Sequence, residues 1–220
     1  MAIKLSGPMV APENGVARQA MVLLHGYGSD GNDLIGLVPY FRDLMPEALF
    51  VAPNAPHSCA INPIGFEWFA IDHAAEVRDF SGIQSVREDI AGFLEDLWAQ
   101  TGIAPADTIL CGFSQGAMIA LDTGLHLEQD ILGIVAFSGG ISPAAIPDIP
   151  PGRQVPVCLV HGDADDVVPV EMSQRAESVL AAAGVRVTLH ISPGMGHGIG
   201  PDAVEFTREF IAGICATKSS

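Results

Sequence analysis

Short apolar runs alternate with longer segments of mixed polarity along most of this chain. Each run is five to seven residues long, which suits a strand better than a helix. The runs lie at residues 20–24, 48–52, 108–113, 131–137, 155–160 and 185–191. Because they are apolar throughout, both faces of each strand are expected to be buried, as in parallel sheets. The pattern therefore predicts a central, mostly parallel sheet.

Helix-compatible segments separate these runs and supply the crossovers that parallel strands need. They lie at residues 32–45, 80–100, 115–127, 170–183 and 202–216. Pro169 and Pro201 stand near expected first turns, and Gly184 follows an Ala-rich end. The alternation predicts an α/β fold of three layers, with helices on both faces of the sheet. The stretch AIKLSGPMVA near the N-terminus predicts an extra antiparallel edge hairpin.

One longer segment, residues 55–80, interrupts the alternation. Irregular segments of this length are usually functional or disordered, and Phe66, Trp68 and Phe69 argue against disorder here. We find no internal repeat and no low-complexity linker. A chain of 220 residues with 49% hydrophobic residues is therefore expected to form a single domain over residues 1–220.

Charge and cysteine content narrow the class of protein. The net charge of −16 opposes binding to nucleic acid and stable association with anionic membranes. The sequence shows neither an apolar stretch of membrane-spanning length nor the apolar core of a signal peptide. Four widely spaced cysteines without a CxxC pair indicate reduced thiols. We expect a cytoplasmic protein and leave a homodimer open.

Ser114 stands between Gly112 and Gly116 at the junction of a predicted strand and a predicted helix. The stretch GFSQG fits the pattern G-x-S-x-G, in which a sharp turn lifts a serine hydroxyl above the sheet. Glycines two residues before and after the serine leave room for that turn. A glycine-rich turn whose serine only caps the helix would show the same pattern. The motif alone makes Ser114 a candidate nucleophile.

A serine nucleophile needs a base and an acid that orients the base. The stretch PGMGHGIG follows the last strand, and its His197 is the predicted base because this glycine-rich loop can reach Ser114. The stretch HGDADDVVP follows the preceding strand and offers three candidate acids, Asp163, Asp165 and Asp166. Both stretches lie at carboxyl ends of strands, where open parallel sheets place their sites. Spacing alone does not choose among the three carboxylates.

Other histidines are expected to have structural roles. His25 and His161 each precede a glycine at a strand end and are predicted to brace loops through hydrogen bonds to the backbone. His190 lies within a predicted strand and is interpreted as structural.

Four motifs in order, LLHGYG, GFSQGA, HGDADDVVP and GMGH, resemble the phospholipase/carboxylesterase family of α/β-hydrolases, which includes acyl-protein thioesterases. The resemblance spans nearly the whole chain. It implies a catalytic triad of Ser114, Asp165 and His197, and an oxyanion hole formed by the backbone N–H groups of Tyr27 and Gln115. Asp163 and Asp166 would then form turns or cap a helix. Neither a metal nor an organic cofactor is implied.

The function that this resemblance implies is that of a serine carboxylesterase. We expect it to hydrolyse esters of small to medium acyl chains through an acyl-enzyme. Acyl-protein thioesterase or lysophospholipase activity would use the same machinery. The acidic surface favours a soluble ester over a membrane phospholipid, and depalmitoylation of proteins is left open.

The walls of an acyl pocket are predicted in the insertion and beside the triad. Trp68, Phe66, Val167 and Met195 are the main candidates, and Ile64 and Phe69 of the insertion are further ones. The alternative is that these side chains only bury the insertion against the core. Family members are similar in carrying WF here, but Ala70 replaces the Asp that usually follows, and Asp72 is displaced.

Three alternative interpretations were weighed. The stretch GYGSDG fits a dinucleotide fingerprint, but Pro53, Asn54 and Ala55 stand where an acidic residue should hold the ribose. A calcium loop is rejected because Val168 occupies the position that needs glycine. A catalytically silent binding protein of the same fold is disfavoured, because every residue type of the triad is present. Labelling by a fluorophosphonate probe distinguishes an active hydrolase from such a silent protein. An active hydrolase is labelled, and Ser114→Ala loses the label.

Overall fold

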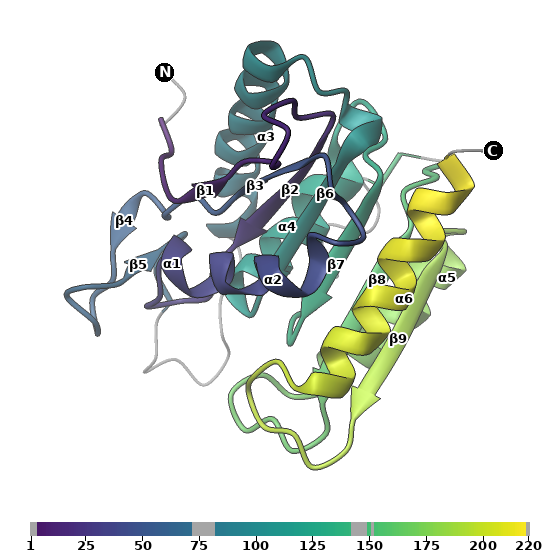
Figure 1. Cartoon of the computed structure of the whole chain (residues 1–220). Helices are drawn as coiled ribbons and strands as arrows, with labels where there is room; N and C mark the ends of the chain where they lie inside the picture. Colours follow the sequence, from purple (N-terminus) through teal and green to yellow (C-terminus); the bar gives the residue numbers. More distant parts are fainter. Residues whose placement is uncertain (1–3, 72–81, 142–148, 151, 219–220) are drawn as a thin grey trace.

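A seven-stranded sheet forms the centre of the computed structural model, which describes residues 4–71, 82–141, 149–150 and 152–218 (Figure 1). The strand order is β1-β3-β2-β6-β7-β8-β9. All neighbours from β3 to β9 are parallel, and only β1 is antiparallel to its neighbour. The strands are β1 Met9–Val10, β2 Gln19–Leu24, β3 Ala48–Val51, β6 Thr108–Phe113, β7 Gly133–Phe137, β8 Val157–Gly162 and β9 Val187–Ser192.

Helices cover both faces of the sheet (Figure 1). One face carries α3, α4 and α5, and the other carries α1, α2 and α6. The helices are α1 Gly31–Leu34, α2 Val38–Phe41, α3 Gly82–Thr101, α4 Gln115–His126, α5 Glu171–Ala182 and α6 Pro201–Lys218, with 3₁₀ turns η1 Ile35–Leu37 and η2 Pro105–Asp107. The predicted three-layer α/β architecture is confirmed. None of these helices, within the residues that the structure describes, is long and apolar enough to cross a membrane.

Alternation of strand side chains divides the core into two layers. In β2, Val22 and Leu24 pack with the layer under α3, α4 and α5, whereas Met21 and Leu23 pack with the layer under α1, α2 and α6. All four side chains are fully buried. Because both faces of the sheet are covered, a strand must be apolar at every position, which explains the uninterrupted runs of the sequence.

In the N-terminal third, one predicted helix and one predicted hairpin differ from the elements that the structure shows. Residues 32–45 do not form one helix but the succession α1, η1 and α2. Pro39 lies near the start of α2, where its missing N–H costs nothing, but its ring excludes a continuous helix through the preceding turn. Among the described residues of the predicted edge hairpin, only the two-residue strand β1 pairs with β3, with Met9 opposite Val51, while residues 2–3 lie outside the described part.

The insertion predicted over residues 55–80 is partly regular. Strands β4 His57–Ser58 and β5 Phe66–Glu67 form a two-stranded antiparallel sheet, while residues 72–80 lie outside the described part. The Phe66 N–H donates to the Ser29 carbonyl at 2.8 Å, and the Gly28 N–H donates to the Phe66 carbonyl at 2.9 Å. These bonds join the insertion to the turn that follows β2.

Candidate active site

Ser114 occupies a strained elbow between β6 and α4. Its backbone angles are φ 55° and ψ −116°, a region that residues with a side chain rarely adopt. A Cβ atom placed on Gly112 would lie 2.2 Å from the Gly116 carbonyl oxygen, and one on Gly116 would lie 2.0 Å from the Leu24 carbonyl oxygen. The expected steric role of both glycines is confirmed, because no other residue fits this crossing of backbones.

His197 connects Ser114 to Asp165. Its Nε2 atom lies 3.0 Å from Ser114 Oγ, and its Nδ1 atom lies 2.7 Å from Asp165 Oδ2. The three side chains come from the segments after β6, β8 and β9, at the carboxyl edge of the sheet. Since the carboxylate holds the Nδ1 proton, Nε2 is free to accept a proton from the serine hydroxyl.

Hydrogen bonds from two backbone amides and from His197 hold the Asp165 carboxylate. Its Oδ1 atom accepts hydrogen bonds from the N–H groups of Val167 at 2.9 Å and Val168 at 2.8 Å. Burial by itself raises the pKa of Asp165, but the hydrogen bonds from His197 and from the Val168 and Val167 amides outweigh it. The pKa therefore lies below its ordinary value, and the group is an anion at neutral pH.

The structure separates the three carboxylates that the sequence left open. The Oδ1 atom of Asp163 accepts the Gly194 N–H at 2.6 Å. Asp166 is exposed. Only Asp165 of these three meets His197, while Asp163 braces the loop on which His197 is carried.

His25 braces its loop as predicted. Its Nε2 atom accepts the Ala55 N–H at 3.0 Å, so its Nδ1 atom carries the proton and donates to the Gly26 carbonyl at 2.8 Å. Burial lowers the pKa of His25, and the contact with the Gly26 carbonyl offsets this only in part. The ring is therefore a neutral link between the turn after β2 and the start of the insertion.

His161 also contacts the backbone as predicted, but it has a second contact that the sequence reasoning missed. Its Nε2 atom lies 2.8 Å from the Val168 carbonyl oxygen and 3.2 Å from Asp165 Oδ2. Its Nδ1 atom lies 2.7 Å from the hydroxyl of Ser173, which in turn donates to the Gly139 carbonyl at 2.6 Å. The buried His161 ring therefore contacts the same carboxylate oxygen of Asp165 that His197 contacts. His190, by contrast, pairs with Asp202 of α6 at 2.8 Å.

The turn containing Tyr27 lies directly beside Ser114. A Cβ atom placed on Gly26 would lie 3.4 Å from Ser114 Cβ and 3.1 Å from Phe113 Cδ1. Gln115, the other predicted donor, is the first residue of α4, where backbone N–H groups point out of the helix end. The structure therefore brings both predicted oxyanion residues next to the serine.

Side chains of the insertion brace this arrangement. The Gln115 side chain accepts the Trp68 N–H at 3.0 Å and donates to the Phe69 carbonyl at 2.8 Å. The Trp68 indole N–H donates to the His25 carbonyl at 2.9 Å. These three bonds tie the insertion to the serine elbow and to the turn of Tyr27, a role of the Gln115 side chain that the motif did not reveal.

The four predicted pocket residues lie in different environments. Trp68 is only 1% exposed, and its two N–H groups are hydrogen-bonded to Gln115 and His25. Phe66 and Met195 are half-buried, and Val167 is 42% exposed. Their contact with an acyl group stays a prediction.

Two adjoining hollows open beside His197, and no described residue of the insertion lines either of them. The inner one, of about 330 Å³, is lined by Leu34, Leu37, Phe113, His197, Gly198 and Ile199, with Asp33 at its edge. The outer one, of about 700 Å³, shares Asp33, Leu37 and Ile199 with it and extends between α2 and α6. The Phe113 and His197 rings lie 4.8 Å apart, centroid to centroid. We call the two hollows together the His197 groove.

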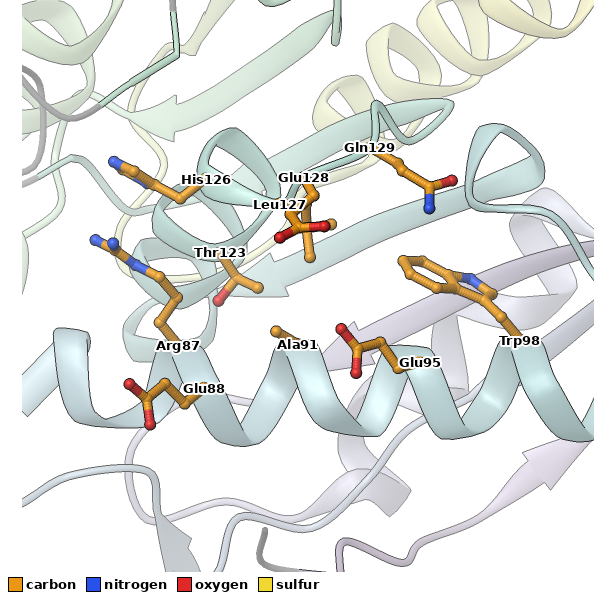
Figure 2. Close-up of a pocket in the computed structure, with 10 residues that line it drawn as sticks. All are labelled: Arg87, Glu88, Ala91, Glu95, Trp98, Thr123, His126, Leu127, Glu128 and Gln129. Atoms are coloured by element: carbon orange, nitrogen blue, oxygen red, sulfur yellow. The ribbon is translucent and has the colours of Figure 1, made fainter.

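A separate pocket of about 230 Å³ lies between α3 and α4 (Figure 2). It is lined at the carboxyl end of α4 by Thr123, His126 and Leu127, and across from them by Trp98 of α3. Ser114 stands at the other end of α4, a helix roughly 18 Å long. This pocket therefore has no part in the chemistry at Ser114.

Within the described residues, no group of three or more His, Cys, Asp or Glu side chains is placed to hold a metal ion. The sheet order, the strained serine elbow and the hydrogen-bonded serine, histidine and aspartate together define the molecule as an α/β-hydrolase.

Comparison with known proteins shows to which family of α/β-hydrolases the chain is similar. Residues 5–215 match the model of the phospholipase/carboxylesterase family. Acyl-protein thioesterase 1 of Saccharomyces cerevisiae is 32% identical over 222 residues, covering 94% of this chain and 97% of that protein. Esterase YpfH of Escherichia coli is 26% identical, covering 89% and 82% respectively. The crystal structure of esterase PE8 is 48% identical, with a TM-score of 0.92, and covers 96% of this chain and 100% of its own.

The chain belongs to the phospholipase/carboxylesterase family, and it is a hydrolase that acts on ester bonds.

Proposed function

We propose that the protein is a carboxylesterase in which Ser114 is the nucleophile, His197 the general base and Asp165 the group that orients the base. The observation that carries this proposal is the continuous chain of hydrogen bonds from Ser114 Oγ through His197 to Asp165. As the hydroxyl attacks the acyl carbon, its proton passes to His197 Nε2, and the Asp165 anion stabilises the resulting imidazolium. The proton then goes to the leaving alcohol, and water repeats the cycle to release the acid.

The negative charge that forms on the carbonyl oxygen also needs donors. We assign this role to the backbone N–H groups of Tyr27 and Gln115, because the Gly26 turn and the start of α4 flank Ser114. Gln115 has the additional advantage of the positive end of a helix dipole. A donor of this kind contributes on the order of a hundredfold to a thousandfold in rate.

The substrates we propose are carboxylic esters with small to medium acyl chains. Two related proteins are named esterases, and one of them is nearly half identical to this chain. We also propose that the protein acts in the cytoplasm. In support, all four cysteines are free thiols, and burial raises the pKa of the Cys158 thiol to about 12, which keeps it unreactive.

Replacing Ser114 tests the nucleophile. Ser114→Ala should abolish hydrolysis of p-nitrophenyl butyrate and labelling by a fluorophosphonate probe, because both need the hydroxyl. The thermal unfolding midpoint should remain close to that of the native protein, which shows that the fold is retained. Hydrolysis at an undiminished rate by Ser114→Ala would rule out the proposed mechanism.

Thioester hydrolysis is a second candidate, favoured by the 32% identity to a yeast acyl-protein thioesterase. The same elbow and triad would attack either acyl carbon. An ester and a thioester of the same acyl group, octanoyl for example, should be compared by their values of kcat/KM. A preference for the thioester by more than tenfold would favour this second function.

A further inference from the structure

The position of the His197 groove can be compared with the four groups that surround the acyl carbon during the reaction at Ser114. In the tetrahedral intermediate the acyl carbon carries four groups: Ser114 Oγ, the oxyanion, the acyl chain and the oxygen of the leaving alcohol. The oxyanion is directed to the donors at Tyr27 and Gln115. The leaving oxygen must lie against His197 Nε2, because that atom supplies its proton. The inner hollow is lined by the same His197 ring, so the group that protonates the leaving oxygen also borders this hollow.

Apolar side chains that pack on the core form most of the walls of the groove. Leu37, Phe113, Ile199 and Val204 are half-buried and pack on the core layer under α1, α2 and α6. Each of them lines one or both of the two hollows. A hollow whose walls are anchored in the core is already formed before a ligand enters, so binding needs little reorganisation.

Charges at the edge of the groove are mostly negative. Asp33 is exposed at the junction of the two hollows, and Glu205 is exposed at the outer one. The positive Arg208 is neutralised by two hydrogen bonds to Asp43, at 2.8 Å and 2.7 Å. Such an edge repels an anionic alcohol and accepts a neutral one.

We propose that the His197 groove binds the alcohol part of the ester and selects neutral, apolar, elongated alcohols. This inference rests on the proposed function, since it assumes that His197 protonates the leaving group. In the step concerned, the bond between the acyl carbon and Ser114 Oγ has formed. The bond from that carbon to the alcohol oxygen breaks, and this oxygen takes the proton of His197 Nε2 and leaves along the groove as the free alcohol.

Two substrate series test the proposal. The first keeps the acetyl group and lengthens the alcohol from methyl to octyl acetate, and the second keeps the ethyl alcohol and lengthens the acyl chain from acetate to octanoate. In the native protein, kcat/KM should rise roughly twofold to fourfold for each methylene added on the alcohol side, the gain expected for burying one methylene. A flat alcohol series would overturn the proposal.

The variant Leu37→Ala and its control Leu44→Ala test whether the dependence on alcohol length arises in the His197 groove. Both leucines are half-buried and pack on the same core layer, but only Leu37 lines the groove. Leu37→Ala should reduce the rise per methylene in the alcohol series and leave the rise in the acyl series as it is. Leu44→Ala should leave both series unchanged. Thermal unfolding of both variants measures the stability that each loses.

The outcomes separate this inference from the proposed function. If Ser114→Ala removes all activity and Leu37→Ala leaves the alcohol series unaltered, the triad stands and the groove assignment is wrong. If Leu37→Ala instead flattens the acyl series, the groove binds the acyl chain and the inference is also overturned. Activity that persists in Ser114→Ala contradicts the proposed function itself.

Discussion

Asp165 is distinguished from its neighbours by the atoms around its carboxylate rather than by its place in the loop. Each of its oxygens accepts hydrogen bonds, Oδ1 from two backbone N–H groups and Oδ2 from His197. We therefore expect Asp165→Asn to lower kcat by about ten-thousandfold, because an amide no longer fixes the histidine in the required tautomer. The measurement is kcat for a p-nitrophenyl ester.

Asp166→Asn is the matched control for this change. Asp166 lies next to Asp165 in the chain but is exposed, so its replacement should leave kcat within about threefold of the native value. If Asp166→Asn lowers kcat as strongly as Asp165→Asn, the orienting acid has been assigned to the wrong carboxylate.

The residue types in the sequence predict most members of the site, but they do not predict which side chains contact one another. Ser114 and His197 stood out because one motif and one glycine-rich loop follow predicted strands. The choice of Asp165 depended on the family resemblance, since three carboxylates within four positions of one loop differ only in how that loop folds. The contact of Gln115 with Trp68 joins residues that are 47 positions apart in the chain, and the contact of His161 with Asp165 depends on how four residues of one loop turn back on themselves. No local pattern reports such contacts.

At the scale of elements, the crossing of α4 over the end of β2 requires a glycine. A Cβ atom on Gly116 would lie 2.0 Å from the Leu24 carbonyl oxygen, and this backbone atom cannot move without displacing β2. Gly116→Ala should therefore lower the free energy of unfolding by roughly 3 kcal/mol, at the upper end of overpacking costs, and should also reduce activity. Urea unfolding measures the change.

Gly213→Ala provides the comparison within another helix. Gly213 lies in α6, and a Cβ atom there would meet open space. This variant should gain up to about 1 kcal/mol of stability from improved helix propensity. Equal effects of the two substitutions would show that the close crossing at Gly116 is not the cause of the loss.

A salt bridge joins α6 to the segment that follows α2. Arg208 donates two hydrogen bonds to Asp43 and another to the Tyr40 carbonyl. Its hydrogen bonds lower the pKa of Asp43 to about 2 from an ordinary value of 3.8. Because the pKa is lowered on folding, the stabilisation is present above pH 4 and is lost as the pH falls toward 2.

Asp43→Asn should accordingly lower the thermal midpoint at pH 7 and at 0.1 M salt. The difference from the native protein should shrink between pH 4 and pH 2, and also in 1 M NaCl, where exposed charges are screened. Arg208→Gln should cost more than Asp43→Asn, because it also removes the bond to Tyr40. A difference that is independent of pH would exclude the ion pair as its cause.

The pattern of apolar residues predicts where the strands and helices lie more reliably than it predicts the residues at which they begin and end. The run at residues 108–113 coincides with β6, whereas the run at 155–160 begins two residues before β8, which continues to Gly162. Hydrophobic residues indicate which part of a strand is buried, whereas backbone pairing sets where the strand ends. His161 and Gly162 extend β8 because they pair with Ile191 and Ser192 of β9. The division of residues 32–45 was detectable, since Pro39 and Gly36 both disfavour a continuous helix.

At the scale of the whole molecule, the net charge of −16 acts on every ligand that approaches the carboxyl edge of the sheet. The exposed Asp33 and Glu205 bring this charge to the rim of the His197 groove. Repulsion of an anion by such a field weakens as salt shortens its range, from about 30 Å at 0.01 M to about 8 Å at 0.15 M. Salt should therefore discriminate between charged and neutral substrates.

Hexyl acetate and its carboxylate analogue, 6-acetoxyhexanoate, make this discrimination measurable, because they differ mainly in charge at the far end of the alcohol. At 10 mM salt the anion should be the poorer substrate, and its kcat/KM should rise threefold or more on going to 300 mM NaCl, whereas hexyl acetate should change little. Glu205→Gln removes one charge at the groove and should reduce this salt effect for the anion alone. An equal response of both esters to salt would mean that the charge of the molecule acts on its stability or on the triad, rather than on the substrate as it enters.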